Sequence, residues 1–226
     1  MATIADNLAN VRSRIAAARA RAGREAGDVT LVAVTKTVTP AEIAELHRLG
    51  VRDFGENRVA DGAAHRAALG GDDSRWHLIG HLQRNKAADA LAGGFLRIHS
   101  VESPRLLEVL ERECARLSLR AEILLEVNVS GEESKYGVSP DRLPELARLA
   151  GAAEHLDFSG LMTMAPFTDN PEDSRPHFRR LAGLRRDTEQ ALGRSLPHLS
   201  MGMTGDFEVA VEEGATLVRI GTALFS

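Results

Sequence analysis

The sequence predicts a single α/β domain over residues 1–226, folded as a (β/α)8 TIM-type barrel with an extra N-terminal helix. Two observations lead to this fold class: eight short apolar segments typical of strands recur along the chain, and segments typical of helices separate them. The strand segments are nearly continuous in apolar residues, as in LVAV at 31–34 and EILLEV at 122–127, which indicates parallel strands buried on both faces. An open doubly wound sheet is the alternative, although no GxGxxG motif follows the first strand.

The extra helix comes first, and the strands follow it. Near the N-terminus, apolar residues recur at helical spacing before glycines at 23 and 27 end the pattern: Leu8, Val11, Ile15 and Ala18. The predicted strands, in chain order, are residues 30–35, 52–55, 76–80, 96–100, 121–127, 157–163, 197–200 and 216–220. Eight strands is the number that closes this type of barrel.

Between the strands, the sequence carries signals for the ends of helices. Ser/Thr-Pro pairs at 39–40, 103–104 and 139–140 predict helix starts, because the hydroxyl caps free amides and proline suits the first helical position. Glu42, three residues after Thr39, predicts a capping box. Three glycines predict helix ends in the left-handed conformation: Gly50, Gly93 and Gly214.

The composition excludes several classes of protein. The formal net charge is −4, aromatic residues make up 4% and no long basic run occurs, so the features of a nucleic-acid-binding surface are missing. The one cysteine, Cys114, falls on the apolar stripe of a predicted helix and cannot form an internal disulfide. No segment resembles a signal peptide or a transmembrane helix. We therefore expect a cytoplasmic protein with no nucleic-acid or membrane partner.

In a barrel of this type the active site lies at the C-terminal ends of the strands. Lys36 follows the first predicted strand, where we expect the ammonium to lose hydration and to become a nucleophile toward an aldehyde. Closure makes the first and last strands neighbours, so Arg219 should face the same cavity. The alternatives are a lysine in a salt bridge at the rim and an arginine paired with Asp206 or Glu208.

The ends of the last two strands predict an anion site. Ser200 ends the seventh strand, and Gly221 and Thr222 follow the eighth, so backbone amides and hydroxyls can approach a phosphate. A lysine that can form an imine, beside a phosphate site, describes a site for pyridoxal 5′-phosphate (PLP). A Schiff-base barrel of aldolase type that uses no cofactor is an alternative, and such a protein would be colourless. No metal site is expected, because His77 and His81 lack the spacing of metal ligands.

Seven segments also carry a resemblance to a known family. They are LVAVTKTV at 31–38, DFGEN at 53–57, WHLIGHLQRNK at 76–86, LLEVNVSGEESKYGV at 124–138, GLMTMAPF at 160–167, LSMGMTGDFEVAVEEGAT at 199–216 and VRIGTALF at 218–225. With them the chain resembles the pyridoxal phosphate homeostasis protein family, whose barrel is similar to the N-terminal domain of alanine racemases. The resemblance runs from the first strand to the C-terminus.

The resemblance implies a role for six residues. Lys36 would hold the cofactor as a Schiff base, and Asn57 and Arg219 would approach its ring. The phosphate would be bound by three residues: Ser200, Gly221 and Thr222. An arginine that donates to the pyridine nitrogen would keep that nitrogen unprotonated and disfavour carbanion chemistry. Two departures from the family pattern stand out: residues 58–62 read RVADG where a Tyr-Val-Gln-Glu-like stretch is usual, and Thr204 replaces a frequent serine.

The function implied is a PLP carrier that acts in intracellular vitamin B6 homeostasis and not an enzyme with robust turnover. The alternative is a weak PLP-dependent amino acid racemase, which would need a second base. The one tyrosine, Tyr136, lies in a loop of the active face and is a candidate acid, although a packing role is the simpler interpretation. We expect a monomer whose partners are PLP, free amino acids and, transiently, apo forms of PLP enzymes.

Overall fold

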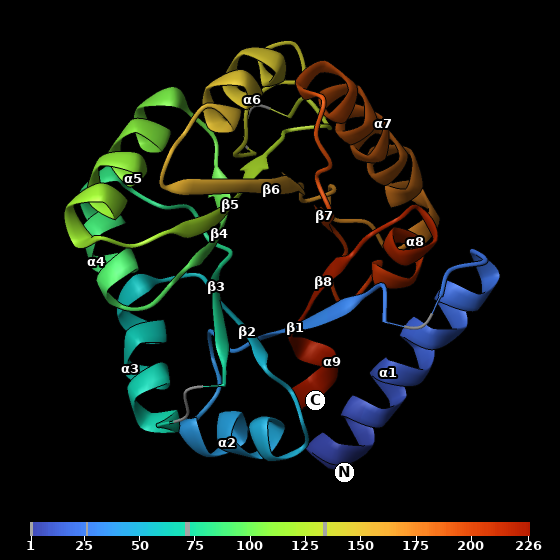
Figure 1. Cartoon of the computed structure of the whole chain (residues 1–226). Helices are drawn as coiled ribbons and strands as arrows, with labels where there is room; N and C mark the ends of the chain where they lie inside the picture. The colour runs from blue at the N-terminus through green and yellow to red at the C-terminus, as the bar shows by residue number, and fades with distance from the viewer. Residues whose placement is uncertain (1, 26, 71–72, 133–134) are drawn as a thin grey trace.

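Eight parallel strands close into a barrel, as the sequence predicts. The computed structural model describes residues 2–25, 27–70, 73–132 and 135–226. Each strand pairs with the next one in the chain, and β1 pairs with β8 to close the ring (Figure 1). The strands are β1 Thr30–Val34, β2 Asp53–Glu56, β3 Arg75–Leu78, β4 Arg97–Val101, β5 Ala121–Glu126, β6 Leu156–Met162, β7 His198–Ser200 and β8 Leu217–Ile220. The predicted strand ends differ from these by one or two residues, and the doubly wound alternative is wrong.

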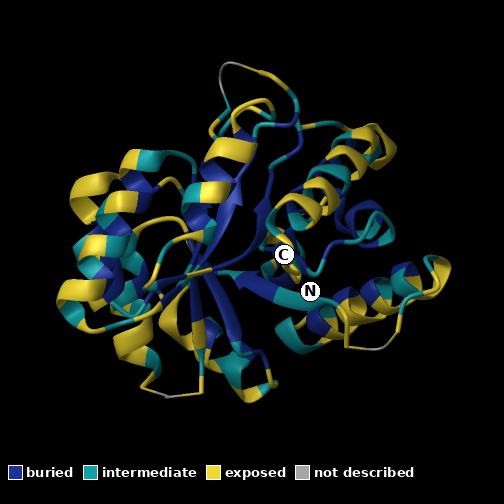
Figure 2. Ribbon diagram, turned by 45° about the horizontal axis from the view of Figure 1, so that its top comes forward, coloured by how far each residue is buried: buried dark blue, intermediate teal, exposed yellow. Residues whose placement is uncertain are grey.

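Helices surround the barrel on the outside, where they bury the outward faces of the strands (Figure 2). Their bounds are α1 Ile4–Arg21, α2 Pro40–Arg48, α3 Val59–Leu69, η1 Arg84–Lys86, α4 Ala87–Ala92, α5 Pro104–Leu117, α6 Leu143–Gly151, η2 Pro171–Ser174, α7 Arg175–Leu192, α8 Phe207–Glu212 and α9 Thr222–Phe225. The layer between strands and helices holds most of the buried apolar side chains, and Cys114 is among them, as predicted. None of the described helices is long and apolar enough to cross a bilayer.

The extra N-terminal helix packs beside the last two helices of the chain. The predicted apolar stripe of α1 is buried, and Thr3 caps the helix in a capping box with Asp6. The side-chain amide of Asn7 donates to the carbonyl oxygens of Leu224 and Ser226, at 3.3 and 2.9 Å. This contact ties the two ends of the described chain together on the outside of the β1–β8 junction (Figure 1).

Two of the three predicted helix starts are confirmed, and one is wrong. Thr39 forms the predicted capping box with Glu42, and Ser103 caps α5. The helix after Ser139 begins only at Leu143, because residues 140–142 form a turn in which backbone amides bond to the Ser139 carbonyl. That helix has no side-chain cap.

Of the three glycines predicted to be left-handed, two are confirmed and one is not. Gly50 and Gly214 have φ of +85° and +101°, which confirms the prediction for both. Gly93 does not, since its φ is −73° and the left-handed residue is the next one, Gly94, at +84°. The helix therefore extends one residue further than the glycine pattern alone indicates.

The barrel interior is divided into an apolar and a polar part. A small apolar cluster of inward residues fills the middle: Val32, Leu124, Met162 and Leu217. Register places Val32 opposite Arg219 across the β1–β8 closure, so the arginine sits at the level of this cluster. Beside it, a set of buried polar side chains comes from β2, β3, β4, β5, β7 and β8: Asp53, His77, His99, Glu126, Ser200 and Arg219.

Candidate functional site

Four of the six predicted site residues lie just past the C-terminal ends of their strands. Lys36 lies two residues after β1, Asn57 one residue after β2, and Gly221 and Thr222 directly follow β8. The other two, Ser200 and Arg219, lie inside the barrel at the ends of β7 and β8. Parallel strands that close into a barrel bring all eight of these ends to one mouth. The pairing of Val34 with Gly55 and of Ala33 with Ile220 places Lys36 between Asn57 and Gly221 around that mouth.

The environment of Lys36 differs from the expected one. Its side chain is exposed at the mouth, so the expectation that burial removes its hydration is wrong: the strand ends two residues earlier and the chain turns outward. No carboxylate of the described residues lies within 4 Å of its amine, so the rim salt bridge is absent there as well. The neighbouring Thr35 is buried and hydrogen-bonded through its hydroxyl to Glu56, at 2.5 Å.

Glu56 fixes the two strand ends that carry Lys36 and Asn57. Its Oε1 accepts from Thr35 and is 2.8 Å from Nδ1 of His65 on α3, while its Oε2 is buried without a hydrogen-bond partner among the described residues. The carboxylate thus ties the end of β1 to β2 and α3. Through Glu56, the DFGEN motif holds in place the end of β1, which leads directly into Lys36.

Arg219 is buried below the mouth and makes two hydrogen bonds inside the barrel. Its Nη1 donates to the Ser200 hydroxyl at 2.5 Å, and its Nη2 donates to the Thr163 carbonyl at 2.9 Å. Burial lowers the pKa of its guanidinium to about 10, an effect partly offset by the charges of Glu126 and Asp206. The group is still a cation at neutral pH.

The alternative of an arginine paired at the rim is not observed. Asp206 instead accepts from the Met203 amide at 2.7 Å and from the Ser174 hydroxyl at 3.1 Å, and Glu208 pairs with Arg14 at 2.8 Å. Among the described residues, no carboxylate lies within 4 Å of the Arg219 guanidinium. Asp206 therefore shapes the loop after β7, and the inner end of that loop borders the mouth.

Ser200 does not present its hydroxyl to the mouth. The side chain is fully buried, and its Oγ lies 2.8 Å from Nδ1 of His99 as well as 2.5 Å from Arg219. Both neighbours lie inside the barrel, so in this structure the hydroxyl supports Arg219 and not an anion. The expectation that this hydroxyl binds phosphate is therefore not met, because β7 ends with Ser200 facing inward.

Free backbone donors are found at the ends of β7 and β8. Among the described residues, no hydrogen bond uses the amides of Gly202, Gly221 or Thr222. Gly202 has φ of +90°, and a Cβ there would lie 2.5 Å from Ala210, so only glycine fits this close approach. The Thr204 hydroxyl, 3.5 Å from the Ala223 amide, supports the start of α9. These unpaired donors fit a phosphate group.

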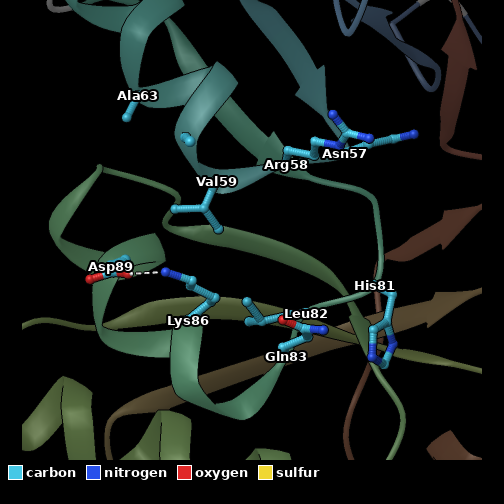
Figure 3. Close-up of a pocket in the computed structure, with 10 residues that line it drawn as sticks. Asn57, Arg58, Val59, Ala63, His81, Leu82, Gln83, Lys86 and Asp89 are labelled. Atoms are coloured by element: carbon cyan, nitrogen blue, oxygen red, sulfur yellow. Dashed lines mark hydrogen bonds and ion pairs between the residues drawn. The ribbon is translucent and has the colours of Figure 1, made fainter.

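Asn57 also borders a separate cavity beside the mouth. The cavity measures about 580 Å³ and lies between the loops after β2 and β3 (Figure 3). Its polar lining includes Arg58, His81, Gln83 and Lys86, and Lys86 is paired with Asp89 at 3.2 Å. None of the other five predicted site residues lines it. Arg58, Val59 and Ala60 belong to the stretch after DFGEN that departs from the family pattern, and they line this cavity.

Tyr136 stands at the rim, where it stacks on His81. The two rings are 4.4 Å apart between centroids with an angle of 20°, and the tyrosine is 54% exposed. His81 is also 3.2 Å from Glu102. Ser134 of the same loop lies outside the described residues. Within the described residues, no group of three or more His, Cys, Asp or Glu could hold a metal ion.

Sequence reasoning missed Glu126, the last residue of β5. It is 2% exposed, and burial together with the nearby charge of Glu102 raises the pKa of its carboxyl to about 7, although Arg219 opposes this. His99 was missed as well. The signal for both was alternation along the strand, which points every second side chain inward.

Gly80 controls the distance between the ends of β2 and β3. A Cβ at Gly80 would lie 2.4 Å from the Asn57 carbonyl oxygen and 2.7 Å from its Cα, so neither backbone can yield easily. We expect Gly80→Ala to lower the free energy of unfolding by about 1–3 kcal/mol. Urea denaturation measures this. Gly183→Ala in α7 is the control, because its Cβ would meet only Arg186 at 3.9 Å and should stabilise the helix by about 0.5–1 kcal/mol. Equal losses in both variants would contradict the close approach.

Comparison with known proteins agrees with this geometry. A family model described as "Alanine racemase, N-terminal domain" matches residues 7–226. The alanine racemase of Clostridium difficile 630 shares the fold alone: the TM-score is 0.76 at 16% identity, over 97% of this chain and 59% of the racemase. The fold and the mouth therefore define a barrel of the alanine racemase N-terminal type.

Two relatives that match over nearly their full length identify the family within this class of barrel. The pyridoxal phosphate homeostasis protein of Aquifex aeolicus is 43% identical over 220 residues, which cover 97% of this chain and 96% of that protein. PipY of Synechococcus elongatus PCC7942, in a structure with PLP bound, has a TM-score of 0.87 at 34% identity and covers 99% of this chain and 100% of its own. The chain belongs to the pyridoxal phosphate homeostasis protein family.

Proposed function

We propose that the protein binds PLP at the barrel mouth, attached covalently through Lys36, and serves as a carrier in vitamin B6 homeostasis. The single observation that carries the proposal is the convergence of an exposed lysine amine, a buried arginine and three unpaired amides at one mouth. The relatives named as homeostasis proteins and the PLP-bound PipY structure support the same function. When bound, the cofactor supplies an aldehyde that reacts with amines and a ring that can withdraw electrons.

Different residues of this chain would hold different parts of the cofactor. Lys36 supplies the amine, and the tie between Thr35 and Glu56 fixes the strand end before it. The amides of Gly221 and Thr222, with that of Gly202, supply donors to the phosphate. Arg219 presents a fixed positive charge from within the barrel, which disfavours protonation of a ring nitrogen nearby. Asn57 lies on the other side of Lys36 and can donate to the ring substituents.

The rim supports a carrier more than a racemase. A racemase needs two bases, one on each face of the substrate. Tyr136, the candidate second base, is exposed and stacked on His81, and nothing described orients its hydroxyl toward Lys36. We therefore propose that the protein exchanges its cofactor with free amines or with the lysine of an apo-enzyme. A cytoplasmic monomer fits this role.

The test compares binding with turnover in one sample. The purified protein is mixed with PLP, dialysed and examined by absorbance, and then incubated with single L-amino acids in deuterated water. A carrier retains near-visible absorbance and leaves Cα–H unexchanged in the recovered amino acid. Deuterium at Cα would support the racemase, whereas a colourless protein would favour the aldolase-type barrel and overturn the proposal.

Thr222→Val tests the phosphate donors separately. The side chain of Thr222 is exposed at the start of α9, so valine should fold normally and remove only a hydroxyl. Loss of a hydrogen bond to a charged group is worth about 1.5–3 kcal/mol, so the dissociation constant for PLP should rise about tenfold or more. Equilibrium dialysis measures it. Ser226→Ala, which removes an exposed hydroxyl at the other end of α9, should leave the constant unchanged; an equal effect would argue against the phosphate contact.

A further inference from the structure

A row of five buried side chains crosses the barrel interior and ends at Arg219. Asp53 Oδ1 is 2.9 Å from His77 Nε2, and His77 Nδ1 is 2.9 Å from His99 Nε2. His99 Nδ1 is 2.8 Å from the Ser200 hydroxyl, which accepts from Arg219 at 2.5 Å. The five residues come from β2, β3, β4, β7 and β8, and none is more than 4% exposed. The row begins at the first residue of β2, toward the opposite end of the barrel from the mouth.

The groups at the two ends of the row fix the direction of every hydrogen bond in it. Asp53 receives two bonds from Arg75, at 2.7 and 2.5 Å. Burial raises the pKa of the Asp53 carboxyl, but the bonds from His77 and Arg75 outweigh this and lower it to about 2. Asp53 is therefore an acceptor only, and Arg219 is a donor only.

Two neutral rings lie between these ends. Burial lowers the pKa of His77 and lowers that of His99 well below its usual value. Since Asp53 accepts, His77 carries its hydrogen on Nε2 and accepts at Nδ1. His99 must then carry its hydrogen on Nε2 and accept at Nδ1, which leaves the Ser200 O–H to donate to His99 and its oxygen to accept from Arg219. Every hydrogen of the row points from Arg219 toward Asp53.

We propose that Ser200, His99, His77 and Asp53 are positioning residues that hold the Arg219 guanidinium at the floor of the cofactor site. This inference rests on the proposed function, since the cofactor is what Arg219 would face. One N–H of the guanidinium donates to the Ser200 hydroxyl at the end of the row, and another donates to the Thr163 carbonyl. Because the Ser200 hydrogen is committed to His99, the hydroxyl does not serve the phosphate, which would depend on the backbone amides and the Thr222 hydroxyl.

The tautomers of the two histidines test the direction of the row without any cofactor. We expect 15N spectra of the histidine-labelled, cofactor-free protein at neutral pH to show both rings neutral with hydrogen on Nε2; His77→Gln and His99→Gln assign the signals. A hydrogen on Nδ1 of His99, or a protonated ring, would overturn the proposal, because Ser200 would then be free to donate elsewhere. This result does not depend on PLP binding, so it stands apart from a failure of the proposed function.

Ser200→Ala tests what the row does for the bound cofactor. Removing the hydroxyl frees Arg219 from His99, so we expect a shifted absorbance band and dissociation of PLP that is faster by about tenfold. Ser159→Ala is the matched control, because Ser159 is also a buried barrel serine, with its Oγ 2.8 Å from Glu122, but it lies outside the row. The proposal fails if both variants shift the band equally or if neither does.

A distal variant completes the experiment. Asp53→Asn removes the charge at the far end and should weaken the preference for the Nε2 tautomers and shift the same absorbance band in the same direction as Ser200→Ala. An unchanged spectrum in a folded Asp53→Asn protein would show that the row does not act on Arg219. If this variant does not fold, Ser200→Ala and Ser200→Thr, which retains the hydroxyl and should restore the band, decide the question.

Discussion

Lys36→Ala is expected to abolish the covalent PLP adduct that, under the proposed function, sodium borohydride should trap in the wild-type protein. The reason is that the primary amine of Lys36 can bond to an aldehyde carbon, whereas the arginine and the backbone amides would hold the cofactor only by hydrogen bonds. The side chain of Lys36 is exposed, so its loss should change the free energy of unfolding by no more than about 0.5 kcal/mol. Intact-protein mass spectrometry after reduction measures the adduct.

The composition makes this experiment specific, because the chain has only three lysines, at 36, 86 and 135. Lys86 is paired with Asp89 at the side cavity, and Lys135 lies in the loop after β5. Lys86→Ala and Lys135→Ala are the matched controls and should keep the full adduct. Peptide mapping of the reduced wild-type protein should find the mass increase on the peptide that contains Lys36. An adduct that persists in Lys36→Ala, or that maps to Lys135, would contradict the assignment.

The fold was predictable because strand and helix signals alternate along the whole chain. The apolar strands, the caps at Thr39 and Ser103 and the count of eight strands all agree with the closed barrel. Local signals failed at two helix ends. A turn replaces the predicted first helical turn after Ser139, and Gly94 replaces Gly93 as the left-handed residue.

The site was predictable in outline but not in its internal bonding. Strand order places Lys36, Asn57 and Gly221 around one mouth, and this follows from the sequence once closure is assumed. Which way a side chain at a strand end points depends on the register and shear of the finished barrel, which a single strand does not reveal. For that reason the strand pattern predicts loss of hydration at Lys36, which is exposed, and a phosphate contact for the Ser200 hydroxyl, which faces His99.

Ionisation of the buried Glu126 carboxyl carries an electrostatic cost at neutral and alkaline pH. Burial and Glu102 raise the pKa of its carboxyl from 4.5 to about 7. A raised carboxyl pKa contributes stability that is fully present below the unfolded value and is lost as pH rises through the folded value. At about 1.4 kcal/mol for each pKa unit, ionising the buried group costs roughly 3 kcal/mol above about pH 7. The pKa values of His77 and His99 are lowered, so those rings change stability in the opposite sense, and the wild-type profile alone does not isolate Glu126.

Glu126→Gln is therefore expected to stabilise the cofactor-free protein in alkaline conditions only. At about pH 5 both proteins carry a neutral side chain and should unfold at similar urea concentrations, whereas at about pH 8 the variant should be more stable by up to roughly 3 kcal/mol. Glu122→Gln on the same strand is the control. Burial raises the pKa of Glu122, but the bond from His198 and the charge of Arg97 lower it to about 2, so it is ionised at both pH values and its loss should destabilise the protein at both. A gain in Glu126→Gln that is equal at the two pH values would show that the carboxyl does not titrate between them.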